Sequence, residues 1–175
     1  RLTGTSLQTA GGAISVTARD EMPMGATAVG AAPSRQVGRA GSAAVNDTTS
    51  TVSVALDGST TLAATGDLTL GAESDGTYIA LAGAVAIAVP SGNGKTGAAG
   101  AGIAINTIDT ATPVTVAGAL PLIGLVAVTA QSAQSLVTVA VGGAGAGGFA
   151  LGGSVAYSTL AGQTAVYATP LAAKA

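Results

Sequence analysis

The chain has 175 residues, of which 48% are hydrophobic but only 2% aromatic and 8% charged, and its formal net charge is −2. It contains 27 glycines and no cysteine, histidine or tryptophan, which excludes disulfides, thiolate chemistry and histidine-based catalysis or metal binding. Its six basic residues are scattered and give no basic footprint for nucleic acid. Such small side chains fill thin stacked layers better than thick globular cores, and the many Val and Thr residues favour strands.

The first recurring element is an alternating apolar run that follows a leucine and, four residues later, a glycine. Its three copies have their leucine and glycine at Leu7 and Gly11, Leu62 and Gly66, and Leu120 and Gly124. The aligned apolar runs are Ile14, Val16 and Ala18; Leu68, Leu70 and Ala72; and Val126, Val128 and Ala130. Alternation with period two is the signal of a β-strand. We predict that Val126 and Val128 point into the core, whereas Ala127 does not.

The second recurring element has a glycine, a short apolar alternation, a polar Thr/Ser-rich stretch and another alternation. Its copies begin at Gly41, Gly102 and Gly153. Variable Ala/Gly-rich stretches separate the two kinds of element, and two of these stretches also alternate. Their apolar positions are Ile79, Leu81, Gly83, Val85, Ile87 and Val89, and then Leu136, Val137, Val139 and Val141. No sustained helical stripe or helix cap is found.

This repetition predicts an all-β fold, a parallel β-solenoid built from short strands with Gly, Ser and Asn turns. With about 20 residues per coil and about 4.8 Å between coils, the chain would make about eight coils and a rod of about 40 Å. We expect one continuous array, a piece of a longer chain, with units at residues 1–40, 41–101 and 102–152 and a partial unit at 153–175. Pro23 and Pro33 argue against a regular coil throughout the first unit.

Two glycine-rich stretches could be taken for phosphate-binding loops. Gly143, Gly145 and Gly148 have the spacing G-x-G-x-x-G, but no helix is expected after them and no acidic residue follows Asp109 to bind a ribose. In PSGNGKTG, residues 90–97, Lys95 and its neighbours resemble the end of a phosphate-binding loop, yet the required first glycine is a valine and no helix follows. We interpret the first stretch as a packing surface and the second as a turn, and expect no cofactor.

The carboxylates offer the remaining candidate site. Glu73 and Asp75, with Asp20 and Glu21 at the equivalent place in another copy, could bind Ca²⁺ in principle, but the third copy has uncharged residues there. We interpret them as solvated turns and expect no metal. No nucleophile has a plausible base, because there is no histidine and the two lysines lie in polar or terminal stretches. The sequence therefore predicts no catalytic residues and no enzymatic activity.

A membrane interpretation is the alternative. No charged residue occurs between Asp109 and Lys174, and the run from Leu136 to Tyr157 is long enough to span a bilayer and contains two G-x-x-x-G spacings. Against it, the run is rich in glycine and has no aromatic belt or basic flank. A membrane-associated or pore-forming segment is therefore the second hypothesis.

The stretches VTAQSAQSLVTVAVGGAG from Val128 and ALGGSVAYSTLAGQTAVYA from Ala150 resemble repeats of large bacterial surface adhesins of the filamentous-haemagglutinin and leukotoxin-like group. The resemblance covers most of residues 41–168 and lies in the general residue pattern and in the order of the repeats. It implies a structural segment of a giant secreted or cell-surface protein that forms a fibre, stalk or coat for attachment or assembly. The implied partners are copies of the chain, adjacent repeats or a ligand on another cell surface, with no nucleic acid and no small-molecule substrate.

Overall fold

The computed structural model describes residues 6–9, 12–57, 59, 61–64, 66–117 and 124–169, and this part of the chain is all-β without a helix. Six of the strands have 15 to 21 residues each. The strands are β1 (Ser6–Thr9), β2 (Ile14–Ser34), β3 (Val37–Thr51), β4 (Val54–Leu56), β5 (Thr61–Ala64), β6 (Leu68–Ala88), β7 (Gly97–Val116), β8 (Val126–Ala146) and β9 (Phe149–Ala168). The prediction of an all-β fold with parallel strands is confirmed.

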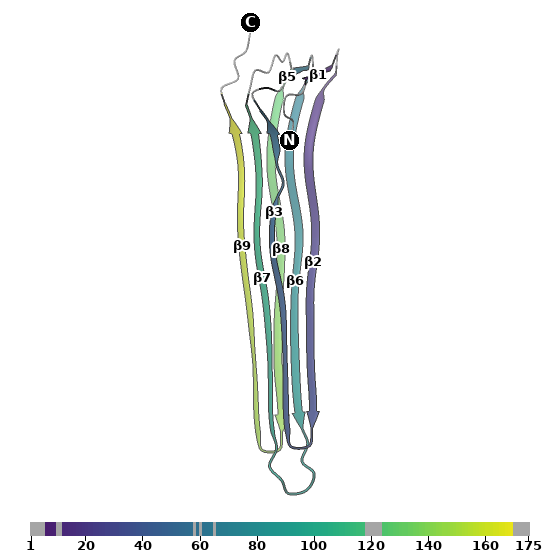
Figure 1. Ribbon diagram of the computed structural model, residues 1–175, viewed down its shortest axis with the longest axis vertical. Helices are drawn as coiled ribbons and strands as arrows, with labels where there is room; N and C mark the ends of the chain where they lie inside the picture. Colours follow the sequence, from purple (N-terminus) through teal and green to yellow (C-terminus); the bar gives the residue numbers. More distant parts are fainter. Residues whose placement is uncertain are drawn as a thin grey trace.

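The long strands form two parallel sheets that lie face to face (Figure 1). One sheet has the order β2-β6-β8; in the other, β7 pairs with β3 and β4 on one side and with β9 on the other. The chain passes from the first sheet to the second through arches at residues 35–36, 89–96 and 147–148. β6 faces β3 and β7, and β8 faces β7 and β9. Each of three successive chain segments therefore contributes one strand to each sheet.

The predicted alignment of the first element is confirmed residue by residue. Ile14 lies beside Leu68, which lies beside Val126, and the register continues without a slip to the arches. The pairing of β1 with β5 also places Leu7 beside Leu62, whereas Gly11 and Leu120 lie outside the described residues. Val126 and Val128 pack against the aliphatic core, as predicted.

The alignment of the second element is wrong by one residue in its middle copy. Gly41 pairs with Ala101, which pairs with Gly153, so Gly102 is one position later than predicted. Because strand side chains alternate between faces, a slip of one residue exchanges the inner and the outer set. In the actual register Asn46 lies beside Asn106, and both side chains point inward.

The prediction of short strands and small coils is also wrong. Each segment forms two strands of about 20 residues, and the strands run along the long axis of the molecule instead of across it (Figure 1). Glycines and prolines suggested turns, but most of them lie inside strands; among the described residues, only Gly92 has a positive φ, of 89°. At about 3.3 Å per residue, a 21-residue strand is about 70 Å long.

The prolines of β2 are compatible with its position at the edge of the sheet. Ile14 donates its N–H to the carbonyl of Asp67, and Val89 donates to the carbonyl of Ser34, so even-numbered residues of β2 bond to β6. Pro23 and Pro33 are odd-numbered, and their missing N–H groups therefore belong to the free edge and remove no bond from the sheet. The first unit forms a regular strand, contrary to the expectation.

Pro113 in β7 explains the break between β3 and β4. Val52 donates its N–H to the carbonyl of Ala111 (2.9 Å). In a regular parallel ladder residue 113 would then donate to the carbonyl of Val52, but proline has no N–H. The ladder is interrupted there and resumes where Val54 pairs with Val114.

The interior between the sheets has three zones along the strands. The zone farthest from the arches is aliphatic and contains Ile14, Val52, Val54, Leu56, Leu68, Leu70, Val114 and Val116. A polar zone follows, with Asn46, Thr48, Ser74, Asn106, Thr110 and Thr112. The zone next to the arches contains almost only alanine and glycine, in two clusters that include Ala44, Ala80, Ala82, Ala104, Ala86, Ala88 and Ala98.

Candidate functional surfaces

The glycines of the G-x-G-x-x-G stretch do not form a phosphate cradle. They lie at the end of β8 and in its arch to β9, and no helix follows them in the described part of the chain. A Cβ on Gly145 would meet nothing within 4 Å, whereas one on Gly148 would lie 2.7 Å from the carbonyl oxygen of Thr96. Neighbouring Gly142 points inward, where a Cβ would overlap the carbonyl oxygen of Gly153 in the facing sheet. Close backbone approach explains Gly142 and Gly148, and Gly145 lies in open space.

The PSGNGKTG stretch forms the long arch between β6 and β7. A strand follows it, so the N-terminus of a helix, which would bind a phosphate, is missing at this place. Lys95 is exposed, and the Thr96 hydroxyl accepts a hydrogen bond from the N–H of Gly147 in the adjacent arch (2.8 Å). The threonine thus joins two arches.

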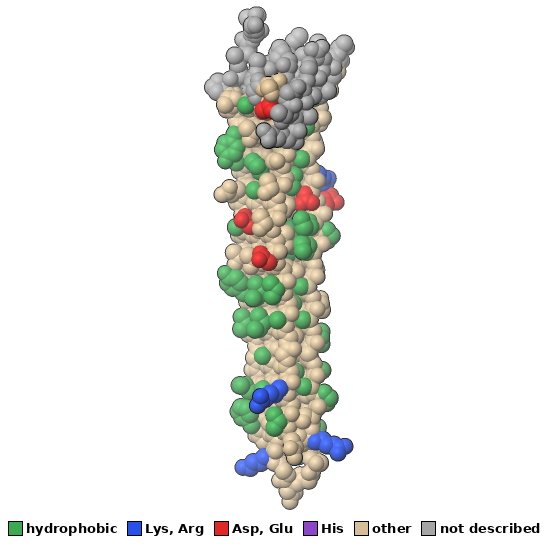
Figure 2. Space-filling model, in the orientation of Figure 1, with side chains coloured by type: hydrophobic (Ala, Val, Ile, Leu, Met, Phe, Trp, Pro, Cys, Tyr) green, Lys and Arg blue, Asp and Glu red, His purple; other side chains and the backbone are tan. Residues whose placement is uncertain are grey.

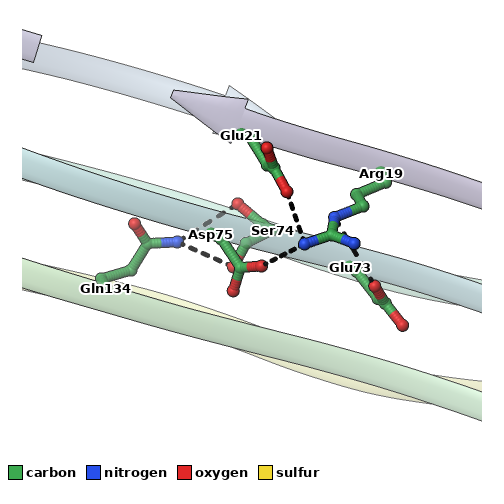
Figure 3. A network of polar contacts seen from close by, with 6 residues as sticks. All are labelled: Arg19, Glu21, Glu73, Ser74, Asp75 and Gln134. Carbon is green, nitrogen blue, oxygen red and sulfur yellow. Dashed lines mark hydrogen bonds and ion pairs between the residues drawn. The ribbon is translucent and has the colours of Figure 1, made fainter. Parts of the chain in front are cut away.

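Three of the four singled-out carboxylates gather around one arginine on the outer face of β2 and β6 (Figure 3). The Arg19 guanidinium forms ion pairs with Glu21, with Asp75 (3.2 Å) and with Glu73 (3.9 Å). We call these four residues the acidic cluster. They lie on strands, not on turns as predicted, and their side chains are 39 to 65% exposed, so the ion pairs stabilise the fold only weakly. No metal-binding group of three or more acidic residues is found in the described ranges.

Asp20, the fourth carboxylate, points inward and belongs to the polar zone. It accepts a hydrogen bond from the Ser50 hydroxyl (2.9 Å). Closer to the arches in the same zone, Asn46 donates to the side-chain oxygen of Asn106 (2.9 Å) and to the carbonyl of Ile79 (2.8 Å), and Asn106 donates to the carbonyl of Val137 (3.0 Å). The sequence did not single out these asparagines, because the alignment that was wrong by one residue separated them. They cross-link the sheets and are shielded from solvent.

The outer face of the first sheet carries larger apolar side chains than the interior beneath it. Between the acidic cluster and the arches, the outward residues of β2, β6 and β8 carry no charge. We call this surface, residues 23–33, 77–87 and 135–145 at odd-numbered positions, the outer belt. Its most exposed large side chains are Val29, Leu81, Val85, Ile87, Val137, Val139 and Val141. On β6 the alternate, inward positions from 80 to 88 are all alanines, each at most 4% exposed.

Charge is segregated along the molecule. Figure 2 shows acidic groups, with one basic neighbour, in the upper part and basic groups alone toward the lower end, with an uncharged region between. The basic residues near the arches are Arg35, Arg39 and Lys95. Arg35 and the acidic cluster therefore lie at opposite ends of the outer belt.

The side of the stack formed by β8 and β9 leaves an open edge in the described part of the chain. Neither strand has a second neighbour in its sheet, and nearly all of β9 is exposed on both faces. A polar depression opens between the sheets there, lined by Thr110, Ser132, Gln134, Leu160, Gly162 and Thr164. The Oε1 atom of Gln134 is shielded from solvent and has no hydrogen-bond partner among the described residues.

The run from Leu136 to Tyr157 forms the second half of β8, an arch and the first half of β9. Among the described residues we find no helix with the length and hydropathy that crossing a membrane requires. Comparisons with protein-family models, with curated proteins and with solved structures find no match for this chain.

Proposed function

We propose that this chain is a structural segment of a large secreted or cell-surface repeat protein, and that its repeats stack as a parallel β-solenoid in a fibre, stalk or surface coat used in attachment or assembly. The observation that carries the proposal is the repeated arch: three chain segments add one strand to each of two parallel sheets in a register that continues over 15 to 21 residues. Stacked repeats of this kind contact only their neighbours, so a further repeat can be added without any change in the existing ones.

The interior supports such an array because like residues stack on like residues. Ala18 lies beside Ala72 and Ala130, and two further ladders near the arches are all alanine: Ala28, Ala82 and Ala140, and Ala32, Ala86 and Ala144. Ladders of identical side chains and continuous backbone pairing stabilise stacked β-arrays. The polar and ionisable side chains take part in this stacking or in surface ion pairs. We accordingly propose no catalytic activity and no cofactor.

The open edge of β8 and β9 is where we propose that the next repeat adds. Strands of about 20 residues with unpaired backbone groups are templates for further strands. The opposite edge differs, since Pro23 and Pro33 remove two donors from the free side of β2. Proline weakens pairing at an edge but does not close this one, because β3, on the same side of the stack, has no proline and can accept β9 of another copy. The partner is a further repeat, in the same chain or in another copy.

The experiment introduces prolines into the open edge at positions whose N–H groups face away from the sheet. Phe149 and Thr169 donate their N–H groups to β7, so even-numbered residues of β9 face the free edge; on β8 the even-numbered residues do so as well, because Leu125 accepts from Leu68. The variant Ala140→Pro with Ala156→Pro should keep the internal ladders and weaken pairing at the growing edge. Val155→Pro is the matched control, because its N–H is needed within the sheet.

Concentrated wild-type protein should form ribbons that grow across the strands, visible by negative-stain electron microscopy and with a 4.8 Å diffraction spacing along the growth axis. The double proline variant should keep its β signal in circular dichroism and form fewer and shorter ribbons, whereas Val155→Pro should lose stability. Ribbons of equal length from the double proline variant would overturn the proposed growing edge. Absence of any assembly from the wild-type chain would overturn the proposed array of copies.

The exposed outer belt supports one other function, contact with a membrane. Large aliphatic side chains outside and alanines inside are what a lipid-facing surface requires. The unpaired strand edges oppose this function, because backbone N–H and C=O groups without partners are costly in hydrocarbon. Co-flotation of the chain with neutral phosphatidylcholine vesicles tests it, and protein that stays at the bottom of the gradient would refute it.

A further inference from the structure

We propose that the outer belt is a lateral contact surface, and that it binds the outer belt of a second copy whose strands run in the opposite direction. This contact extends the proposed array sideways and does not use the open edge of β8 and β9. A chain that forms single ribbons without lateral pairing would refute this inference alone, and a chain that pairs laterally without ribbons would refute only the proposed growth.

Charge complementarity fixes the antiparallel orientation. A two-fold axis that crosses the strands at Ala28 on β2, and so at Ala82 and Ala140, exchanges positions that lie equally far on either side of it. Glu21 lies seven residues before Ala28 and Arg35 lies seven residues after it. Each copy therefore places its Glu21 against the partner's Arg35. Parallel packing would instead oppose acidic cluster to acidic cluster.

On β6 the axis brings no like charge against the acidic residues. Asp75 and Glu73 lie seven and nine residues before Ala82, and the positions related to them by the axis are residues 89 and 91, at the start of the arch that carries Lys95. The acidic cluster has three carboxylates and one guanidinium, so it keeps a net negative charge for this contact. The axis therefore places only uncharged residues, Val89 and Ser91, opposite this negative charge.

Shape agrees with charge at the centre of the belt. Leu81 and Gly83 lie one residue on either side of the axis, so the leucine of each copy faces the glycine of the other. A Cβ on Gly83 would meet nothing within 4 Å, and the notch above it is open for the leucine side chain. On β8 the axis at Ala140 likewise places Val137 against Gly143. At these two pairs of positions large side chains meet glycines, as in closely packed sheets.

The size of the belt is sufficient for a specific contact. From Glu21 to Arg35 it is about 46 Å long, and three strands are about 14 Å wide, so each copy contributes about 650 Å². The pair then buries about 1,300 Å², which lies within the range of about 1,200 to 2,000 Å² for stable specific interfaces. No charge is buried without a partner, because the belt between its two ends is uncharged.

The test measures the dimer dissociation constant by sedimentation velocity, in the Ala140→Pro, Ala156→Pro chain and in the unmodified chain at concentrations below ribbon formation. Glu21→Arg and Arg35→Glu should each weaken the dimer at least tenfold, and the two together should restore it to within about threefold. Arg39→Glu, near the arches but on the opposite sheet, is the matched control and should change nothing. Thermal unfolding of each variant checks that the monomer is intact.

Gly83→Val distinguishes a specific contact from non-specific hydrophobic association. Although it adds apolar surface and fits the monomer, it fills the notch for Leu81 and should weaken the dimer at least tenfold. A stronger dimer, a failure of the charge exchange to restore binding, a monomer at every concentration, or an effect of Arg39→Glu equal to that of Arg35→Glu would each overturn the proposal. Binding to phosphatidylcholine vesicles in place of dimerisation would assign the belt to lipid and overturn it as well.

Discussion

Replacing Gly102 by alanine tests whether the sheets lie so close near the arches that only glycine fits. An added Cβ would lie 2.6 Å from the carbonyl oxygen of Val141 and 3.2 Å from that of Ala82. Ordinary contacts begin at about 3.4 Å, so the sheets would have to separate by about 0.8 Å. A gap of that size removes a quarter to a half of the dispersion energy of the neighbouring contacts. Overpacking of this kind costs about 1 to 3 kcal/mol.

Gly145→Ala is the matched control, because nothing lies within 4 Å of its added Cβ and its φ is not positive. A glycine replaced without strain stabilises by about 0.4 to 1 kcal/mol, since the unfolded chain loses freedom. Urea unfolding followed by circular dichroism should therefore separate the two variants by at least about 1 kcal/mol, with Gly102→Ala below wild type and Gly145→Ala above it. Equal free energies of unfolding would refute the argument that close approach explains the inward glycines.

Three further outcomes are expected. Val128→Asp should lower the free energy of unfolding by about 2 to 4 kcal/mol more than Ala127→Asp, because it places a carboxylate against the aliphatic core, and equal losses in urea would show that the assigned faces are wrong. Asn46→Ala should cost about 1 to 3 kcal/mol in the same assay, since it leaves the buried Asn106 oxygen without its donor, and a loss below about 0.5 kcal/mol would contradict that role. Burial, and secondarily the charge of Asp20, raises the pKa of the Tyr78 phenol above its usual 10.0. The unfolded chain therefore ionises first, stability should be lost as the pH rises above about 10, and Tyr78→Phe should reduce that loss in a pH series of melts.

The sequence carried the strand register of the first sheet almost completely. Alignment by the apolar runs placed Ile14, Leu68 and Val126 together, and the structure pairs the same three residues. The reason is physical: in a parallel stack like residues lie beside like residues, so similarity between copies reports spatial neighbours directly. The second element lacked this signal because its middle copy has Ala101 where the other copies have Gly41 and Gly153, and Gly102 was aligned in place of that alanine.

The strand lengths could not be read from the sequence because glycine and proline have two uses here. As turn residues they would divide each unit into several short strands. In this chain the inward glycines serve the close approach of two sheets, and Pro23 and Pro33 lie where a free edge needs no N–H. Both uses depend on which neighbour a strand has, and that is decided by tertiary structure, not by local propensity.

The sequence also did not show which face of β6 is buried. Alternation shows that Ile79, Leu81 and Val85 share one face of β6 and that alanines share the other, and residue size alone would place the larger set inside. The structure does the reverse, because alanine and glycine on both facing sheets allow backbones to come close over the half of the molecule near the arches. The aliphatic zone at the other end follows the usual rule. The half of β6 far from the arches therefore buries its larger apolar side chains, whereas the half near the arches buries its alanines.

This inversion connects the interior to the proposed assembly. An alanine buries far less apolar surface than a valine or leucine, so the half near the arches gains little free energy from its own interior. The valines and leucines that could contribute more free energy of burial lie on the outer belt. They contribute it only when another surface covers them. If that surface is a second copy, the free energy of unfolding should increase with protein concentration, and the increase should disappear in Leu81→Asp, which removes the contact and leaves the alanine interior untouched. A stability independent of concentration in both chains would mean that the thin interior is sufficient by itself.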